Sequence, residues 1–331
     1  METKNKTRAQ RNRTLTISDS EIQSLDSLIY NHENLQKDFH DNMIVNGDIH
    51  RCLDYVPDEY FDLIILDPPY NLNKDFQTTK FTSMTSDNYT AYLESWFEKV
   101  CRKLKKNGTL YMCGDWKCTS NMQMVIEKEL TILNRITWQR EKGRGAKANW
   151  KNSMEDIWFA VKNPHDYCFN VDAVKIKRKV IAPYRSNGKP KDWEETDSGN
   201  FRVTYPSNLW DDISIPFWSM PENTDHPTQK PEKLIAKLIL ASSNPGDKIF
   251  DPFLGSGTTA VVAKKLNRKY FGIEINPEYC RWAIKRLKNA EFDKTIQGYH
   301  NGVFWERNTP IFSPKHTNYH NSNTNNLFDN I

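Results

Sequence analysis

Residues 67–70, Asp-Pro-Pro-Tyr, are the clearest place in this sequence where residue types and spacing could do chemistry. They follow an apolar run, residues 61–66, that has the character of a buried strand. The two prolines stop the strand and donate no backbone N–H, so their carbonyls are free to accept hydrogen bonds. Asp67 adds a carboxylate acceptor and Tyr70 a flat ring. Acceptors beside a ring suit the exocyclic amine of a flipped nucleobase, and an ordinary proline turn is the alternative.

A glycine-rich turn in residues 248–260, between an apolar strand and a helix, is the second chemical feature. Gly255 and Gly257 permit positive φ and a close backbone approach. Together with Ala260 they satisfy the dinucleotide pattern G-x-G-x-x-G/A. Glu274 ends the next strand, where a carboxylate can accept hydrogen bonds from both hydroxyls of a ribose. This arrangement predicts a cofactor that contains a nucleoside, and a tight turn without a ligand is the alternative.

The acid that ends the strand before the glycines helps to choose that cofactor. A carboxylate at Asp251 opposes a pyrophosphate and suits a cationic group such as an ammonium. The chain has no G-x-x-x-x-G-K-[ST] segment, which disfavours a Walker-type nucleotide site. S-adenosylmethionine carries an ammonium and a sulfonium, and is therefore favoured over NAD.

Charge and composition narrow the class of protein. The net charge is only +4, but residues 135–191 hold 14 bases and 5 acids. That local excess favours a polyanion partner, with a solvated basic loop as the alternative. The six cysteines form no C-x-x-C pair, which argues against a disulfide framework or zinc site. Because there is no secretory signal and no apolar run of about 18–20 residues, we expect a cytoplasmic protein that makes no membrane contact.

The elements that must position these residues alternate between short apolar runs and amphipathic runs. This rhythm predicts an open α/β sheet of buried, parallel strands with helices on both faces. The expected strands are Asn42–Val45, Leu63–Leu66, Thr109–Cys113, Ile132–Trp138, Asp156–Val161, Lys248–Asp251 and Tyr270–Ile275. The expected helices are Tyr89–Leu104, Ser120–Leu130, Pro231–Ser242, Thr258–Leu266 and Pro277–Asn289. Residues 163–225 have no clear period and are predicted to be an insertion, while residues 1–15 and 313–331 are expected to be disordered.

Over residues 40–290 the sequence resembles the S-adenosylmethionine-dependent DNA amino-methyltransferases. In that family D-P-P-Y is the catalytic motif, and turns like Asp251-Pro-Phe-Leu-Gly-Ser-Gly bind the cofactor. The order of D-P-P-Y, insertion and cofactor turn resembles the β-group, whose Rossmann-like methyltransferase fold is circularly permuted. The resemblance implies five regions: a basic arm and leader (1–40), a catalytic half (41–162), an inserted target-recognition region (163–225), a cofactor-binding half (226–291) and a C-terminal extension (292–331), disordered after about residue 312.

The resemblance also implies roles for individual residues. His226-Pro-Thr-Gln-Lys230-Pro resembles the family's H-P-T-x-K-P segment, which makes Lys230 a partner for the cofactor's carboxylate. The catalytic residues implied are Asp67, Pro68, Pro69 and Tyr70. The cofactor-binding residues implied are Asp48, Ile49, Asp67, His226, Lys230, Asp251, Pro252, Phe253, Gly255, Ser256, Gly257 and Glu274. The DNA-binding residues expected in the basic loop and the insertion are Lys142, Arg144, Asn149, Lys177, Arg178 and Arg185.

The function implied is sequence-specific methylation of adenine N6 in double-stranded DNA by base flipping and direct transfer, because DPPY is usually found in N6-adenine enzymes and SPPY in N4-cytosine enzymes. A cytosine-N4 methyltransferase shares nearly all these features. Two functions of different classes also compete with it: an NAD-dependent oxidoreductase that uses the glycine turn, and a catalytically silent nucleic-acid-binding module. A cognate restriction endonuclease and a homodimer are further expectations of the resemblance, and no metal is expected.

Overall fold

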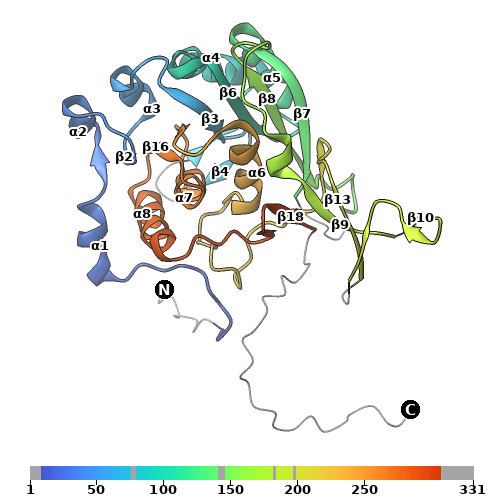
Figure 1. Ribbon diagram of the computed structural model, residues 1–331. Helices are drawn as coiled ribbons and strands as arrows, with labels where there is room; N and C mark the ends of the chain where they lie inside the picture. Colours follow the sequence, from blue (N-terminus) through green and yellow to red (C-terminus); the bar gives the residue numbers. More distant parts are fainter. Residues whose placement is uncertain (1–8, 76–79, 141–145, 182–183, 197–198, 307–331) are drawn as a thin grey trace.

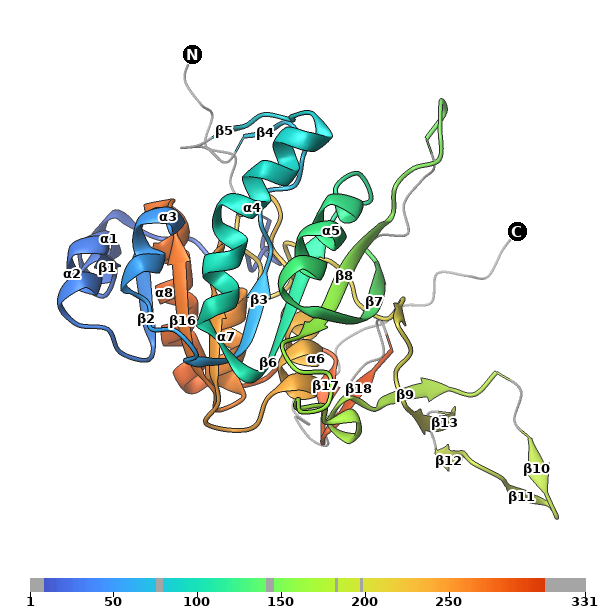
Figure 2. The same cartoon turned by 90° about the horizontal axis from the view of Figure 1, so that it is seen from above.

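The computed structural model describes residues 9–75, 80–140, 146–181, 184–196 and 199–306. Its centre is a nine-stranded sheet in which every neighbouring pair is parallel except the two pairs made by β8 (Figures 1 and 2). In spatial order the strands are β1 (Tyr30–Asn31), β2 (Met43–Asn46), β16 (Lys269–Glu274), β15 (Lys248–Asp251), β3 (Phe61–Leu66), β6 (Leu104–Gly114), β8 (Met154–Val161), β7 (Thr131–Gln139) and β14 (Leu209–Trp210).

Helices cover both faces of this sheet, as the alternating pattern predicts (Figure 2). One face packs against α4 (Ser86–Lys103) and α5 (Thr119–Glu129), whose buried side chains share a core with β3 and β6. The other face packs against α6 (Glu232–Ser242), α7 (Thr258–Lys265) and α8 (Pro277–Phe292). Shorter helices are α1 (Asp19–Asp26), α2 (His32–Lys37) and α3 (Ile49–Cys52), with 3-10 turns at Leu53–Tyr55 and Val171–Val174.

The chain order of the strands is permuted relative to their order in the sheet. β3, which leads into Asp67, comes early in the sequence but pairs with β15, which leads into the glycine turn. As a result the two motifs, separated by more than 180 residues, leave the same edge of the sheet from neighbouring strands. This arrangement confirms the predicted order of catalytic strand, insertion and cofactor strand.

A second sheet has five strands and joins two regions that lie far apart in the sequence (Figure 2). Strand β9 of the insertion pairs with β18 from the C-terminal extension. The order is β12 (Glu194–Thr196), β13 (Gly199–Thr204), β9 (Ile176–Lys179), β18 (Val303–Trp305) and β17 (Tyr299–His300). Two hairpins complete the described strands: β4 (Lys74–Asp75) with β5 (Lys80–Phe81), and β10 (Arg185–Ser186) with β11 (Lys189–Pro190).

Two expectations need correction. The strand predicted at Asp156–Val161 is not parallel to its neighbours, since β8 pairs antiparallel with both β6 and β7. Residues 9–15 are not a disordered arm: Leu15 is buried and its N–H donates to the carbonyl of Asn223 at 2.8 Å. The insertion, although it lacks an apolar period, forms strands. Residues 313–331 lie outside the described part of the chain.

The described residues lack two kinds of feature. They contain no helix with the length and hydropathy of a membrane span. Within the same residues, no group of three or more His, Cys, Asp or Glu side chains has the arrangement of a metal site.

Candidate active site

A cavity of about 470 Å³ opens where the parallel strands end and their connecting loops begin. Ligands in open α/β sheets bind at this edge, beyond the carboxyl ends of the strands. The cavity brings together the segments that the sequence singled out, which follow β2, β3, β15 and β16. The predicted site residues in its lining are Asp48, Ile49, Asp67, Pro68, Pro69, Tyr70, His226, Lys230, Asp251, Pro252, Phe253, Gly255, Ser256 and Glu274.

The Asp67–Tyr70 motif is held rigidly by its own contacts. The Tyr70 hydroxyl donates to Asp67 Oδ1 at 2.8 Å and lies 3.2 Å from Glu155 Oε2. The prolines differ from the expectation that both carbonyls are free, because the Pro69 carbonyl accepts a hydrogen bond from the Tyr89 hydroxyl at 2.9 Å. The Asp67 carboxylate and the Pro68 carbonyl are therefore the acceptors that we assign to a ligand amine, since the Pro69 carbonyl already accepts from Tyr89.

Lys230, which the resemblance implies as a partner for the cofactor's carboxylate, lines the cavity and contacts the catalytic motif. Its buried ammonium lies 2.8 Å from Asp67 Oδ1, 2.7 Å from Asp67 Oδ2 and 3.2 Å from Glu155 Oε2. Burial disfavours the charged form, but Asp67 and Glu155 outweigh it and raise the pKa of Lys230 above its usual range. Lys230 is thus an ion-pair partner of Asp67 in this structure.

The two glycines of the turn have different structural roles. Gly255 lines the cavity with a φ of 54°, and a Cβ there would lie 3.1 Å from Nε2 of His226. Gly257 has a φ of 85° but does not line the cavity, and a Cβ there would lie 2.5 Å from the Cβ of Ala283 on α8. Gly257 therefore permits close packing of α7 on α8 and does not contact the space available to a ligand.

Glu274 fixes the shape of this turn from the next strand. Its Oε2 accepts the Gly255 N–H at 2.7 Å, and its Oε1 accepts the Asn276 N–H at 2.8 Å. Burial raises the pKa of this carboxyl, although these N–H donors oppose the effect. The Ile275 N–H also hydrogen-bonds this carboxylate. Because the two oxygens together have four lone pairs, one remains for a ligand hydroxyl.

Asp251 presents a buried carboxyl to the same cavity. Its Oδ1 accepts the Phe253 N–H at 3.0 Å. Burial raises the pKa of Asp251 from 3.8 to about 7 because desolvation opposes the charged form. A cation bound against this group would favour ionisation and bring the pKa down again.

His226 lines the cavity as a neutral imidazole. Burial and the nearby Lys230 lower its pKa to about 3. Its ring packs edge-on against Tyr279 with centroids 4.4 Å apart. It therefore adds shape to the cavity rather than charge.

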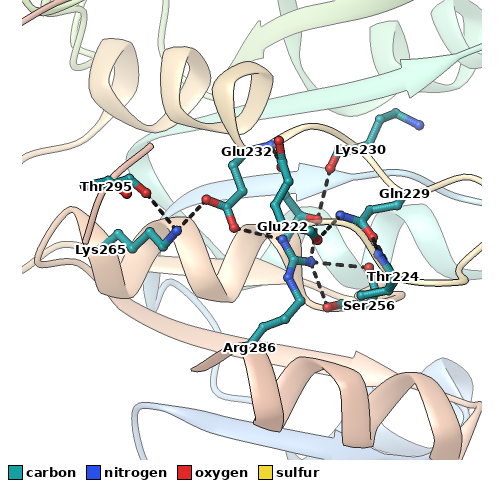
Figure 3. A network of polar contacts seen from close by, with 10 residues as sticks. Glu222, Thr224, Gln229, Lys230, Glu232, Ser256, Lys265, Arg286 and Thr295 are labelled. Atoms are coloured by element: carbon teal, nitrogen blue, oxygen red, sulfur yellow. Dashed lines mark hydrogen bonds and ion pairs between the residues drawn. The ribbon is translucent and has the colours of Figure 1, made fainter. Parts of the chain in front are cut away.

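A buried polar network holds the glycine turn in place through hydrogen bonds from α8 (Figure 3). Arg286 on α8, which is 3% exposed, donates to the Ser256 carbonyl and to Thr258 Oγ1, both at 2.9 Å. The same guanidinium pairs with Glu232 at 3.0 Å, and Thr258 Oγ1 lies 3.1 Å from the Lys230 carbonyl. The network thus joins the glycine turn to the segment that carries Lys230.

Four of the predicted DNA-binding residues do not line this cavity: Asn149, Lys177, Arg178 and Arg185. The other two, Lys142 and Arg144, are outside the described residues. Asn149 is exposed. On the insertion, Lys177, Arg178 and Arg185 each lie 3.3–3.7 Å from an acidic side chain: Glu194, Asp211 and Glu195, respectively. Their interaction with DNA stays a prediction.

Sequence reasoning missed two residues of the site, Arg140 and Glu155. Both line the cavity and are joined by an ion pair of 2.9 Å between Arg140 Nη1 and Glu155 Oε1. Arg140 follows β7 and Glu155 lies near the start of β8. Because β8 is antiparallel, its beginning lies at the edge of the sheet where its neighbours end.

Comparison with known proteins identifies the family. The profile of the DNA methylase family matches residues 61–286, more than half of the chain. The chain belongs to this DNA methylase family. Family membership confirms the predicted resemblance and removes the NAD-dependent oxidoreductase as an alternative.

Curated relatives and solved structures agree with this assignment. This DNA methylase is 35% identical over 255 residues to type II methyltransferase M.HpaI of Haemophilus parainfluenzae, covering 76% of each chain. It is 36% identical over 253 residues to DNA adenine methyltransferase YhdJ of Escherichia coli (strain K12), covering 75% of this chain and 83% of the relative.

Two solved structures share the fold. The M1.HpyAVI–SAM complex has a TM-score of 0.53 at 24% identity, covering 74% of this chain and 98% of that chain. PvuII DNA methyltransferase (cytosine-N4-specific) has a TM-score of 0.52 at 17% identity, covering 77% and 93%. These likenesses confirm the predicted methyltransferase fold.

Proposed function

We propose that this DNA methylase transfers a methyl group from S-adenosylmethionine to adenine N6 in double-stranded DNA. The observation that carries the proposal is the position of Asp67 and Tyr70 on the wall of the cavity that also contains Asp251 and Glu274. One cavity thereby offers acceptors for an amine and acids for a cationic nucleoside cofactor.

The residues of the cofactor half fit S-adenosylmethionine. Asp251 would pair with the cofactor's ammonium, and Glu274 would accept hydrogen bonds from the ribose hydroxyls. Asp48 and Ile49, which follow β2 beside Glu274, would contact the adenine ring of the cofactor. His226, Pro252, Phe253, Gly255 and Ser256 complete the wall. The cofactor, when bound, supplies an electrophilic methyl group on a sulfonium.

The residues of the catalytic half would hold the target base. A base inside the duplex exposes no in-line path to its amine, so it must leave the stack. Asp67 and the Pro68 carbonyl would accept the two amine hydrogens, while the ring of Tyr70 stacks on the base. Acceptors placed there draw electron density toward the nitrogen and stabilise the positive charge that develops on it. Much of the acceleration would come from positioning.

Contact with DNA is assigned to the basic loop and the insertion. The prediction covers Asn149, Lys177, Arg178 and Arg185, together with Lys142 and Arg144. Lys177 and Arg185 pair with Glu194 and Glu195, which are mostly exposed. A duplex phosphate would compete with these two carboxylates for the basic side chains. A cognate endonuclease and a homodimer remain expectations of the resemblance.

The experiment that tests this function is nucleoside analysis of the product. Unmethylated duplex DNA is incubated with the purified protein and methyl-labelled cofactor, digested to nucleosides and resolved by mass spectrometry. N6-methyladenine is the expected product. N4-methylcytosine would replace the N6 assignment, and no incorporation of label would favour a silent binding module.

A further inference from the structure

Glu155 is a buried carboxylate in the catalytic wall that the Asp67–Tyr70 motif does not include. Its side chain is 5% exposed and contacts three partners: Lys230 at 3.2 Å, the Tyr70 hydroxyl at 3.2 Å and Arg140 at 2.9 Å. A buried carboxylate is costly unless such partners surround it. Burial alone would raise its pKa, but Lys230 and Arg140 hold the pKa of Glu155 below its ordinary value. Glu155 is therefore ionised at neutral pH.

The contacts of Lys230 show what Glu155 does. An ammonium has three N–H donors, and the hydrogen bonds of Lys230 go to Asp67 Oδ1 at 2.8 Å, Asp67 Oδ2 at 2.7 Å and the Tyr70 hydroxyl at 3.1 Å. Glu155 Oε2 lies 3.2 Å from the same ammonium as a second ion-pair partner. In this arrangement all three donors are committed inside the catalytic wall. None is left for a cofactor carboxylate.

We propose that Glu155 is a positioning residue for methyl transfer. It is the second counter-charge of the Lys230 ammonium, which donates to Asp67 and to the Tyr70 hydroxyl, so that both groups meet the target base in one orientation. The inference rests on the proposed function, because it assigns Asp67 and Tyr70 to the base.

The lone pairs of Asp67 explain why this orientation matters. Oδ1 accepts from both Lys230 and Tyr70, while Oδ2 accepts from Lys230. A carboxylate oxygen has two lone pairs. The acceptor site that remains is on Oδ2, so the arrangement directs the target amine to that oxygen. Loss of Glu155 would remove one of the two carboxylates that set the position of the Lys230 ammonium, and with it the angle at which Lys230 meets Asp67.

Charge also distinguishes Glu155 from a neutral hydrogen-bonding group. The cluster holds two anions, Asp67 and Glu155, and two cations, Lys230 and Arg140. Removal of the charge of Glu155 leaves Lys230 with one carboxylate and Arg140 with an amide. We therefore expect glutamine, which keeps the shape, to be an inadequate substitute.

The test compares Glu155→Gln in two backgrounds. At saturating DNA and cofactor, E155Q should lower kcat by about tenfold or more, while the Kd of the cofactor measured by calorimetry changes by less than about twofold. On a Lys230→Met background the same substitution should change kcat by less than about twofold, because its partner is gone. E155Q leaves the buried Lys230 with Asp67 as its one carboxylate, and the double variant removes this lysine. The double variant can therefore be tested even if E155Q alone folds poorly.

Asp212→Asn is the matched control. Asp212 is a buried carboxylate paired with Lys237 at 2.8 Å, and it does not line the cavity. D212N should lower the melting temperature as E155Q does but leave kcat near the wild-type value. The inference is overturned if E155Q retains wild-type kcat, if E155Q costs as much on the K230M background, or if D212N lowers kcat equally. A wild-type protein that methylates no DNA would refute the proposed function instead.

Discussion

Binding of the cofactor should release a proton from Asp251. This carboxyl is fully buried in the cofactor half of the cavity, and its pKa is raised to about 7. An ammonium can pair with it only after it ionises. We therefore expect the affinity for S-adenosylmethionine to fall as the pH decreases below 7, and Asp251→Asn to remove that dependence along with much of the affinity.

The size of the effect follows from the raised pKa. The difference between an ordinary value of 3.8 and about 7 corresponds to about 4 kcal/mol for ionising Asp251 in the unliganded protein. Affinity should weaken by about tenfold for each pH unit below 7, since one proton must leave. Without cofactor, the folded chain binds this proton more tightly than the unfolded chain does. The stabilisation is full below 3.8 and is lost as the pH rises through about 7.

Isothermal titration calorimetry measures both consequences. At pH 6, titrations in two buffers with different ionisation enthalpies should report about one proton released per cofactor bound. The useful range ends below about pH 7.7, where the cofactor's own ammonium begins to deprotonate. A wild-type affinity that stays constant from about pH 5.5 to about pH 7.5 would refute the assignment of Asp251, as would a D251N variant that binds like the wild type.

Three further predictions concern single residues. Asp67→Ala should reduce methyl transfer to background in a filter-binding assay while calorimetry still detects cofactor binding; full activity would be incompatible with its role. Glu274→Ala should weaken cofactor binding by at least about tenfold, since it removes both the ribose acceptor and the clamp on Gly255, and an unchanged Kd would contradict this. Gly257→Ala should lower the free energy of unfolding by about 1–3 kcal/mol more than Gly246→Ala. Both glycines have positive φ, but a Cβ at Gly246 meets open space, whereas one at Gly257 meets Ala283. Equal losses of stability in urea melts would contradict the clash with Ala283.

Much of the fold was predictable from the sequence because buried strands and amphipathic helices have distinct periods. The strand at Lys248–Asp251 was predicted with its observed bounds, and the helix at Thr258–Lys265 within one residue. The glycine turn was predictable because glycine is the residue that most readily adopts positive φ, and Gly255 and Gly257 both do so. Asp67 and Asp251 lie close together because they stand at the carboxyl ends of β3 and β15, which are neighbouring parallel strands.

The direction of β8 was not predictable, and this concealed Glu155. A mostly apolar run has the same sequence pattern whether its strand is parallel or antiparallel to its neighbours. In a parallel sheet the start of this strand would lie at the edge opposite the site. The antiparallel pairing with β6 and β7 moves Glu155 to the catalytic edge and places it beside Arg140.

The pairing of strands that lie far apart in the sequence could not be predicted either. Nothing in the polar run of the insertion indicates that β9 takes β18 as its neighbour, since that contact depends on tertiary packing. The place of Lys230 was likewise set by burial beside two carboxylates, which the H-P-T-x-K-P match did not reveal.

We propose that this DNA methylase modifies adenine N6 at a defined sequence in duplex DNA. Single-molecule sequencing with modified-base detection tests it most directly, on DNA from a methylation-deficient host treated with the purified protein. We expect N6-methyladenine at one position of one recurring sequence, and none in DNA treated with D67A. Methylation of cytosine, or methyl groups scattered without a shared sequence, would contradict it.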